Sequence, residues 1–411
     1  MKNLNIHLQQ VFFLSSFFFC LLTNAQQLES LINDGLANNP QIQALQFNYQ
    51  VEAEKVNEAN TLPNTKFSAG YFVSEPETRT GAQVFKLSAK QMLPAFGTIT
   101  AKENYANANA EDVILDIETA KRKLILNIST SYYNLYALQA KQNVLLENIK
   151  LLETYETMAL TSVEVGKASV VDVLRLQIRQ NELSENLDVI QQDFISEQAN
   201  LSRLLNKELN TPITIDSSLD IPETEKLIAE EQIQLNPELT KYDKLYESVS
   251  QLELLNQKEK NPMLGFGLDY INVAERPDMS FSDNGKDIIM PMVSVSIPLF
   301  NNSFKSKTLQ NKLRQQNLTA QKNDRYNTLL ALLKQSESSR NSAKIQYKTL
   351  KQNLKQAKDA ETILIRSYET GAIDFNDVLD LHELQLKFQM NQIETIKNYY
   401  IQTLIINYLT K

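Results

Sequence analysis

The chain contains few of the residues on which most protein chemistry depends. Its 411 residues include one cysteine, two histidines and no tryptophan. Cys20 lies in the first 25 residues, so the rest of the chain has no disulfide or thiol chemistry, and His382 is its one histidine. The sequence shows no Ser/His/Asp set, no metal-ligand cluster and no glycine-rich phosphate loop. We therefore expect neither an enzyme nor a bound cofactor or metal.

Residues 1–25 have the pattern of a secretory signal peptide. Lys2 is their only charge, an apolar core runs from 11 to 22, and Thr23, Asn24 and Ala25 form a small-residue exit. That core is too short to span a bilayer, and no later apolar run approaches about 18 residues. Without this leader, 40 basic residues face 49 acidic ones, a formal net charge of −9, which argues against nucleic acid as a partner. We expect an exported chain that enters a membrane only as strands.

One sequence pattern occurs twice. Each copy is a glycine, five further residues and then Asp-Val-Leu, as at 166–174 and 371–379. A glycine followed by a new helical register ends one helix and begins the next, so each copy predicts the turn of a helical hairpin. Two helix starts also recur, at Asn39-Pro40 and Asn236-Pro237. The pattern predicts two structural repeats, 26–215 and 216–411, which together form one protomer.

Each repeat predicts two strands followed by a very long helix. Apolar and polar residues alternate at 66–74 and 84–90, and again at 264–270 and 293–297, as in transmembrane barrel strands. The stretches 98–165 and 301–370 contain no glycine or proline. In the first, apolar residues recur at spacings of three, four and seven, which indicates a coiled-coil seam. At about 1.5 Å per residue, this helix is expected to run roughly 100 Å.

Four strands cannot close a barrel by themselves. An open sheet edge in lipid leaves unpaired backbone groups, and each costs several kcal/mol. Two copies of the chain would give a barrel filled by side chains, whereas three would give 12 strands and an open lumen. The predicted fold class is mixed: a membrane β-barrel with four strands per protomer, continued by a long α-helical coiled-coil barrel.

Over the length that follows the leader, the chain resembles the TolC-type outer-membrane efflux proteins. The strongest match is local, since 166–174 and 368–380 resemble the two periplasmic tip turns of that family in residue type and spacing. The resemblance implies a homotrimer with a 12-stranded barrel in the lipid of the outer membrane and a helical tunnel in the periplasm. It also implies a passive exit duct of a tripartite efflux or type I secretion system, docked to an inner-membrane pump through a periplasmic adaptor. The alternative is that the chain is itself such a coiled-coil adaptor (membrane fusion) protein.

Asp377 and Asp380 are the first candidates for a functional site. They are three residues apart, so both lie on one face at the start of a helix. Three copies would place six carboxylates in a ring, where like charges repel each other and attract cations. In the family that the chain resembles, acidic residues at this position form the periplasmic constriction. The simpler interpretation is that they complement the helix dipole, and both interpretations can hold.

The resemblance adds a second element to this gate. Asp172 and Tyr368 occupy positions that in the family form a closing link between neighbouring hairpins. Simple capping of a helix by Asp172 is an equally good interpretation. The chain has Ile373 where the family member we compare it with has an arginine, so one polar link is absent.

The hairpin tips are expected to form an exposed surface. Apolar groups exposed at the end of a secreted rod usually indicate a partner. We therefore predict adaptor docking at Val165, Gly166, Val173, Leu174, Gly371, Val378 and Leu379. Lys86 and Lys90 lie on the polar face of a strand and either line the lumen or are solvated near the rim.

The acidic ring can be tested by its conductance. We expect the double variant Asp377→Ala/Asp380→Ala to conduct more in planar bilayers and to lose sensitivity to divalent cations, because the mutual repulsion and the cation site are both removed. Conductance equal to that of the unchanged protein would reject the ring.

Overall fold

The computed structural model describes residues 23–166, 169–209, 211–216, 218–224, 230–278, 280–370, 372–373 and 375–411. The expected leader lies outside these residues except for its last three, which belong to the first described helix. Contacts divide the chain into two compact units. The first comprises residues up to 44 with 118–236 and 326–411, and the second comprises 45–117 with 237–325. Each unit takes segments from both sequence repeats, so the boundary between repeats at 215 and 216 stays a prediction.

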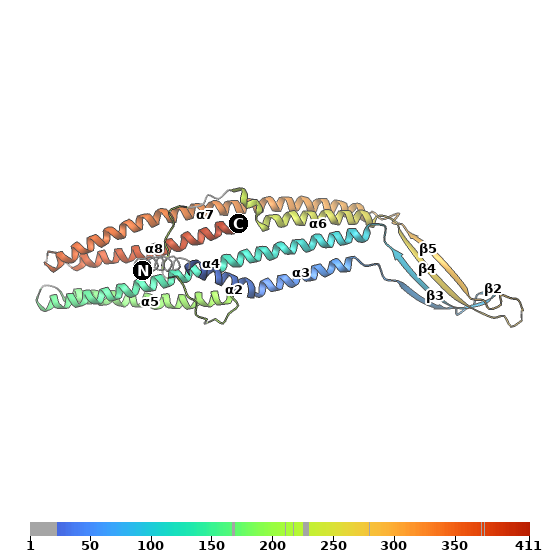
Figure 1. Cartoon of the computed structure of the whole chain (residues 1–411), viewed down its shortest axis with the longest axis horizontal. Coiled ribbons are helices and arrows are strands. Elements are labelled where there is room, and N and C mark those ends of the chain that lie inside the picture. The colour runs from blue at the N-terminus through green and yellow to red at the C-terminus, as the bar shows by residue number, and fades with distance from the viewer. Residues whose placement is uncertain are drawn as a thin grey trace, which may run out of the picture. The chain divides into compact units, whose positions relative to one another are not determined.

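Helix, two main strands, a very long helix and a returning helix follow one another twice along the chain (Figure 1). The first series is α2 (Thr23–Asn38), α3 (Pro40–Ala59), β1 (Lys66–Tyr71), β2 (Glu77–Thr78), β3 (Gly81–Leu93), α4 (Thr98–Glu164) and α5 (Val170–Leu204). The second is the 3-10 helix η1 (Glu230–Leu235), α6 (Pro237–Glu259), β4 (Met263–Ala274), β5 (Ile288–Ser296), α7 (Ser303–Glu369) and α8 (Phe375–Thr410). The helix starts expected at Pro40 and Pro237 are confirmed, as are two helices of 67 residues each, α4 and α7. No helix in the described part of the chain is both long enough and apolar enough to cross a membrane.

The strands form one antiparallel sheet within the second unit. Its order is β1-β3-β4-β5, with the short β2 paired to β3 beyond β1. β1 ends at Tyr71 rather than at Ser74, and β3 begins earlier than the alternation at 84–90 predicts. A register shift between Gln83 and Phe85 explains the second difference, because an irregularity interrupts the period of two that sequence patterns detect. The two-residue β2 was not predicted.

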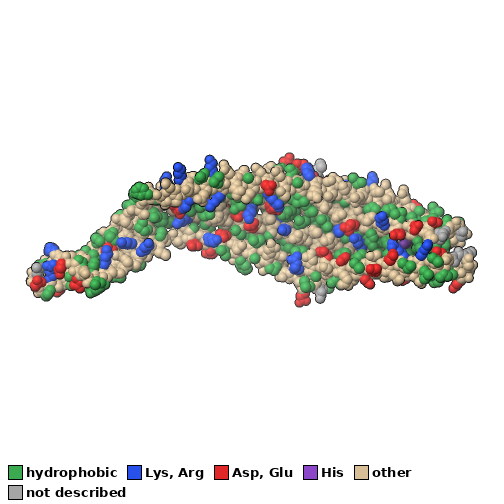
Figure 2. All heavy atoms as spheres, turned by 180° about the vertical axis from the view of Figure 1, so that it is seen from behind, with side chains coloured by type: hydrophobic (Ala, Val, Ile, Leu, Met, Phe, Trp, Pro, Cys, Tyr) green, Lys and Arg blue, Asp and Glu red, His purple; other side chains and the backbone are tan. Residues whose placement is uncertain are grey.

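One face of this sheet is apolar and exposed. Phe67 is 79% exposed and Val293 is 71% exposed, and Figure 2 shows apolar side chains at the surface over the strand-bearing end. The pairing of neighbouring strands places the following residues on this face with them: Ala69, Tyr71, Phe85, Leu87, Ala89, Leu264, Phe266, Leu268, Ile289 and Val295. The opposite face carries serines, glycines, lysines and methionines. The alternation read from the sequence is therefore a true division of the sheet into two chemically different faces.

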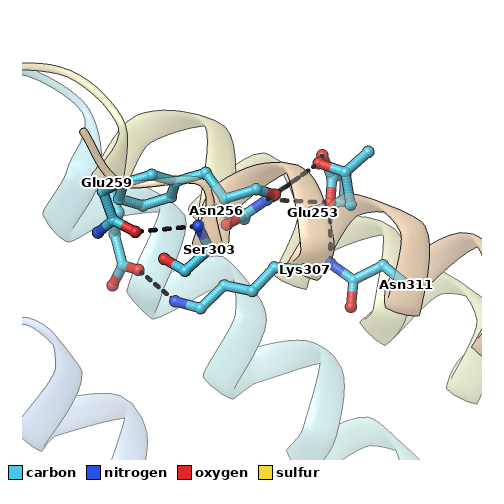
Figure 3. A network of polar contacts seen from close by, with 9 residues as sticks. Glu253, Asn256, Glu259, Ser303, Lys307 and Asn311 are labelled. Carbon is cyan, nitrogen blue, oxygen red and sulfur yellow. Dashed lines mark hydrogen bonds and ion pairs between the residues drawn. The ribbon is translucent and has the colours of Figure 1, made fainter. Parts of the chain in front are cut away.

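A polar network joins α6 and α7 just where β4 begins and β5 has ended (Figure 3). Glu253 accepts hydrogen bonds from Asn311 at 2.9 Å and from Thr308 at 2.8 Å, while Lys307 pairs with Glu259 at 3.5 Å. Partial burial works to raise the pKa of Glu253, but the hydrogen bonds that it accepts outweigh this effect and hold the pKa below its usual value. The network therefore fixes the two helices from which this pair of strands extends.

In the first unit, two repeat-equivalent asparagines fasten the helix ends. Asn39 donates to the carbonyl of Leu204, at the end of α5, at 3.2 Å. Asn236 donates to the carbonyl of Leu409, near the end of α8, also at 3.2 Å. Both asparagines are buried, where an unpaired polar group would be costly. Each repeat therefore returns its last helix to its own starting point by the same side-chain contact.

The described residues 211–216 and 218–224, which follow α5, form no helix or strand, and tyrosines hold them against the helices of this unit. The backbone N–H groups of Asp216 and Leu219 donate to the hydroxyls of Tyr132 and Tyr136, each at 3.1 Å. The hydroxyl of Tyr400 donates to the carbonyl of Asp220 at 2.7 Å. These bonds supply partners for backbone groups that have no ladder or helix of their own.

Candidate functional site

The candidate site lies in the first unit, where α4 meets α5 and α7 meets α8. Figure 1 shows each of these pairs as an antiparallel helical hairpin. One apolar cluster underlies both turns. Partly buried residues of α7, Leu364, Ile365 and Tyr368, pack against it, and its buried members come from α4, α5 and α8: Leu145, Leu152, Tyr155, Ala159, Val173, Leu176, Leu183, Phe375, Val378 and Leu386. The two hairpins of one protomer are thus packed against each other rather than standing apart.

Asp172 caps the helix that begins after the first turn. Ser169 is the N-cap residue of α5, and its hydroxyl accepts from the N–H of Val171 at 3.1 Å. Asp172 completes the capping box by accepting from the N–H of Ser169 at 3.2 Å. Among the described residues no hydrogen bond joins Asp172 to Tyr368. The capping interpretation therefore accounts for the contacts within one chain, and the closing link stays a prediction.

Tyr368 lies beneath the second turn. Its ring meets that of Phe375 edge to face, with 4.9 Å between centroids and 63° between planes. Its hydroxyl is buried and has no hydrogen-bond partner within the part of the chain that the structure describes. An unpartnered buried hydroxyl costs about 1–3 kcal/mol. Tyr368 is therefore held by its ring while its polar end remains available for an acceptor.

Asp377 and Asp380 are both exposed at the start of α8. Phe375, Val378 and His382 occupy the opposite, buried side of the same helix. Asp377 lies in the first turn, where a carboxylate complements the helix dipole. The shared exposed face is what a ring of carboxylates would require, and the ring itself stays a prediction.

The predicted docking surface needs correction. Val173 is only 6% exposed and Val378 only 2%, so the prediction that they lie on the tip surface is wrong. Both follow the helical period of the inward-facing stripe, Val173 with Leu176 and Val378 with His382, and so pack between the hairpins. Leu379 is half-buried, and Gly371 lies outside the described residues.

The exposed apolar tip is made by a different set of residues. Val165, Gly166 and Leu174 are exposed as expected, and Gly166 has a φ of 73°, which a residue with a side chain adopts only with strain. Val170 and Val171 were missed by the sequence reasoning, although they are 61% and 52% exposed. The sequence did contain a signal for their exposure, because they do not lie on the helical stripe of Val173 and Leu176 that faces inward.

A ladder of polar contacts, also not foreseen, joins the two hairpins along their length. Nearest the turns, Arg175 donates to Asn376, and Arg179 pairs with Glu383 at 3.7 Å. Further along, three more contacts follow: Tyr155 to Glu361 at 2.7 Å, Asn148 to Gln389 at 3.2 Å and Lys141 to Glu394 at 2.9 Å. The two ion pairs, Arg179 with Glu383 and Lys141 with Glu394, are partly exposed and contribute at most about 1 kcal/mol each, so the buried cluster supplies most of the adhesion.

His382 is a histidine that packs beside this cluster. It is buried, and its ring lies edge to face with Tyr155 at 6.1 Å between centroids. Burial is the main cause that lowers the pKa of His382 below its usual value of 6.5. The described residues contain no group of three or more His, Cys, Asp or Glu side chains placed to hold a metal ion.

Comparison with known proteins gives a family match and a shared fold. Residues 31–207 match the family model of the outer membrane efflux proteins. CusC, described in connection with folding and transmembrane channel formation, is 14% identical with a TM-score of 0.77 over 94% of this chain and 92% of that chain. The outer-membrane channel OprN is 16% identical, with a TM-score of 0.76 over 94% of this chain and 90% of that chain.

The outer membrane protein VceC from Vibrio cholerae is 17% identical, with a TM-score of 0.75 over 94% of this chain and 96% of that chain. A search of the curated proteins found no match. At identities this low, the likeness shows a common fold over nearly the whole of each chain.

The buried histidine predicts a pH dependence of stability. Because the folded-state pKa is lowered, folded and unfolded chains bind the same number of protons above pH 6.5, and no stability is lost there. Below pH 6.5 the unfolded chain takes up a proton that the buried ring resists, so the melting temperature of the helical signal in circular dichroism should fall. His382→Gln should remove this part of the pH dependence. An unchanged pH dependence in that variant would contradict the assignment.

Proposed function

We propose that this chain, whose resemblance to the TolC-type outer-membrane efflux proteins is supported by a family match over residues 31–207 and by its fold, is the outer-membrane exit duct of a tripartite export system. It resides in the outer membrane and extends into the periplasm. Solutes pass through it without chemical change, and the energy comes from the inner-membrane pump. The adaptor alternative is not supported, because such a protein would have one hairpin and no exposed apolar sheet.

The observation that carries this proposal is that the sheet of β1, β3, β4 and β5 has an exposed apolar face and two unpaired edges in the described part of the chain. Its apolar face is exposed, and its two edge strands, β1 and β5, have no partner on their outer sides among the described strands. Lipid satisfies the apolar face, but it offers no hydrogen bonds to the edges. Joining β5 of one protomer to β1 of the next removes both edges. Three protomers then close a 12-stranded barrel with a lumen.

The gate is proposed to form where the hairpin turns of three protomers converge. Asp377 and Asp380 would contribute six carboxylates, and the free hydroxyl of Tyr368 would face a group from the neighbouring protomer. The buried apolar cluster, together with the five polar contacts between the hairpins, holds each protomer together as one body. Opening would therefore move protomers relative to one another more readily than it would separate the hairpins within one.

The membrane role of the sheet is tested by two neighbouring residues on opposite faces. Val293→Lys places a charge on the apolar face and should cost about 2–4 kcal/mol at mid-membrane, preventing insertion into the outer membrane. Ser294→Lys places the same charge on the polar face and should leave insertion intact. The measurement is the amount of heat-modifiable trimer in outer-membrane fractions. Equal yields from the two variants would contradict a lipid-facing Val293.

Adaptor docking is proposed at the revised tip of Val165, Gly166, Val170, Val171 and Leu174. The chain beyond the leader has no cysteine, so single-cysteine variants report one position each. Cells producing Val170→Cys should give a thiol cross-link to a periplasmic adaptor identified by mass spectrometry. The buried position in Val173→Cys should give none. A cross-link of equal yield from Ile345→Cys, exposed on α7 far along the sequence from either turn, would refute docking at the tip.

A further inference from the structure

The polar face of the sheet carries an unbalanced set of charges. Lys66 on β1 lies directly opposite Lys90 on β3, and Lys86 lies on the same face, four residues from Lys90 along β3. Like charges directly opposite in an antiparallel pair are destabilising. Asp269 is the single acidic residue in β1, β3, β4 and β5. The sheet therefore places two lysines against each other with one carboxylate available for three ammonium groups.

The carboxylate of Asp269 pairs with Lys86. Asp269 is fully buried and forms an ion pair with Lys86. Lys90 is close enough to Asp269 to interact with it through the electric field, but it forms no ion pair with it. Lys66 and Lys90 are both exposed, and neither has an ion-pair partner in the described part of the chain. Two positive charges per protomer therefore remain uncompensated at one level of the sheet.

The neighbouring strand is shaped to accept Lys90. Gly267 on β4 is paired with Lys90, and a Cβ on that glycine would lie 3.2 Å from Cγ of Lys90 and 3.3 Å from Cε of Met292. The apolar stem of Lys90 thus crosses the bare backbone of Gly267 and keeps the ammonium group at the open surface of the face. The position of Lys90 is built into the sheet by the residue beside it.

We propose that Lys66 and Lys90 form an anion-binding ring inside the duct, and that polyvalent anionic solutes are the class that it attracts. The inference rests on the proposed function, because closure by three protomers turns the polar face toward the lumen and collects six uncompensated lysines at one level. A water-filled channel lined by one sign of charge concentrates counter-ions within it. Screening by salt weakens this attraction, so the ring acts most strongly at low ionic strength.

The test is block of the channel by inorganic pyrophosphate in planar bilayers at low salt. Pyrophosphate is added to each side of the bilayer in separate experiments. The unchanged protein should show a concentration-dependent loss of single-channel current. In Lys66→Gln/Lys90→Gln, the half-blocking concentration should rise by about tenfold or more, since the local anion concentration falls by at least that factor.

Two controls make the outcome decisive. Lys66→Arg/Lys90→Arg keeps both charges and should keep the block, whereas Lys286→Gln removes a lysine from the loop between β4 and β5 and should not change it. If pyrophosphate blocks the Lys66→Gln/Lys90→Gln pores as well as it blocks the unchanged pores, the lysine ring is overturned and the proposed duct still stands. If the unchanged trimer forms no pores, the duct itself is overturned, and the ring with it.

Discussion

The backbone hydrogen bonds of a single antiparallel sheet are the constraint on which the architecture depends. Four strands with one exposed apolar face suit lipid, but lipid cannot satisfy the N–H and C=O groups of β1 and β5 at the edges. No rearrangement within one chain removes two edges from an open sheet. The proposed assembly with further copies therefore follows from the strands themselves rather than from an addition to a finished fold.

The duplicated sequence supplies the strands of this sheet in two similar halves. Each repeat brings two strands, one very long helix and one returning helix, and each closes on itself through a buried asparagine, Asn39 or Asn236. The polar network around Glu253 holds the helix pair that leads into β4 and out of β5. The two repeats thus use the same kind of side-chain contact, from Asn39 and from Asn236, to close on themselves. The remaining irregular segment is held by tyrosine hydroxyls rather than by secondary structure.

At the hairpin turns, one set of residues is buried and holds the two hairpins together, and another set is exposed. Val173, Val378 and His382 face inward and hold the two hairpins together. Asp377, Asp380, Val170 and Val171 face outward at the same level. The residues that pack between the hairpins are therefore distinct from those that the proposed gate and docking tip use.

The spacing of apolar residues and the positions of glycine and proline in the sequence determined the order of elements, the lengths of α4 and α7, and the two faces of the sheet. These features depend on local spacing along the chain. The starts at Pro40 and Pro237 follow from the same local chemistry. Tertiary structure alone decided which turn residues are buried, since Val173 and Val170 differ only in helical phase relative to the other hairpin. It also decided the contacts between hairpins, such as Arg179 with Glu383, and the pairing of Lys66 with Lys90. Register between strands and the partner that each helix face packs against are relations between distant segments, and a local pattern does not specify them.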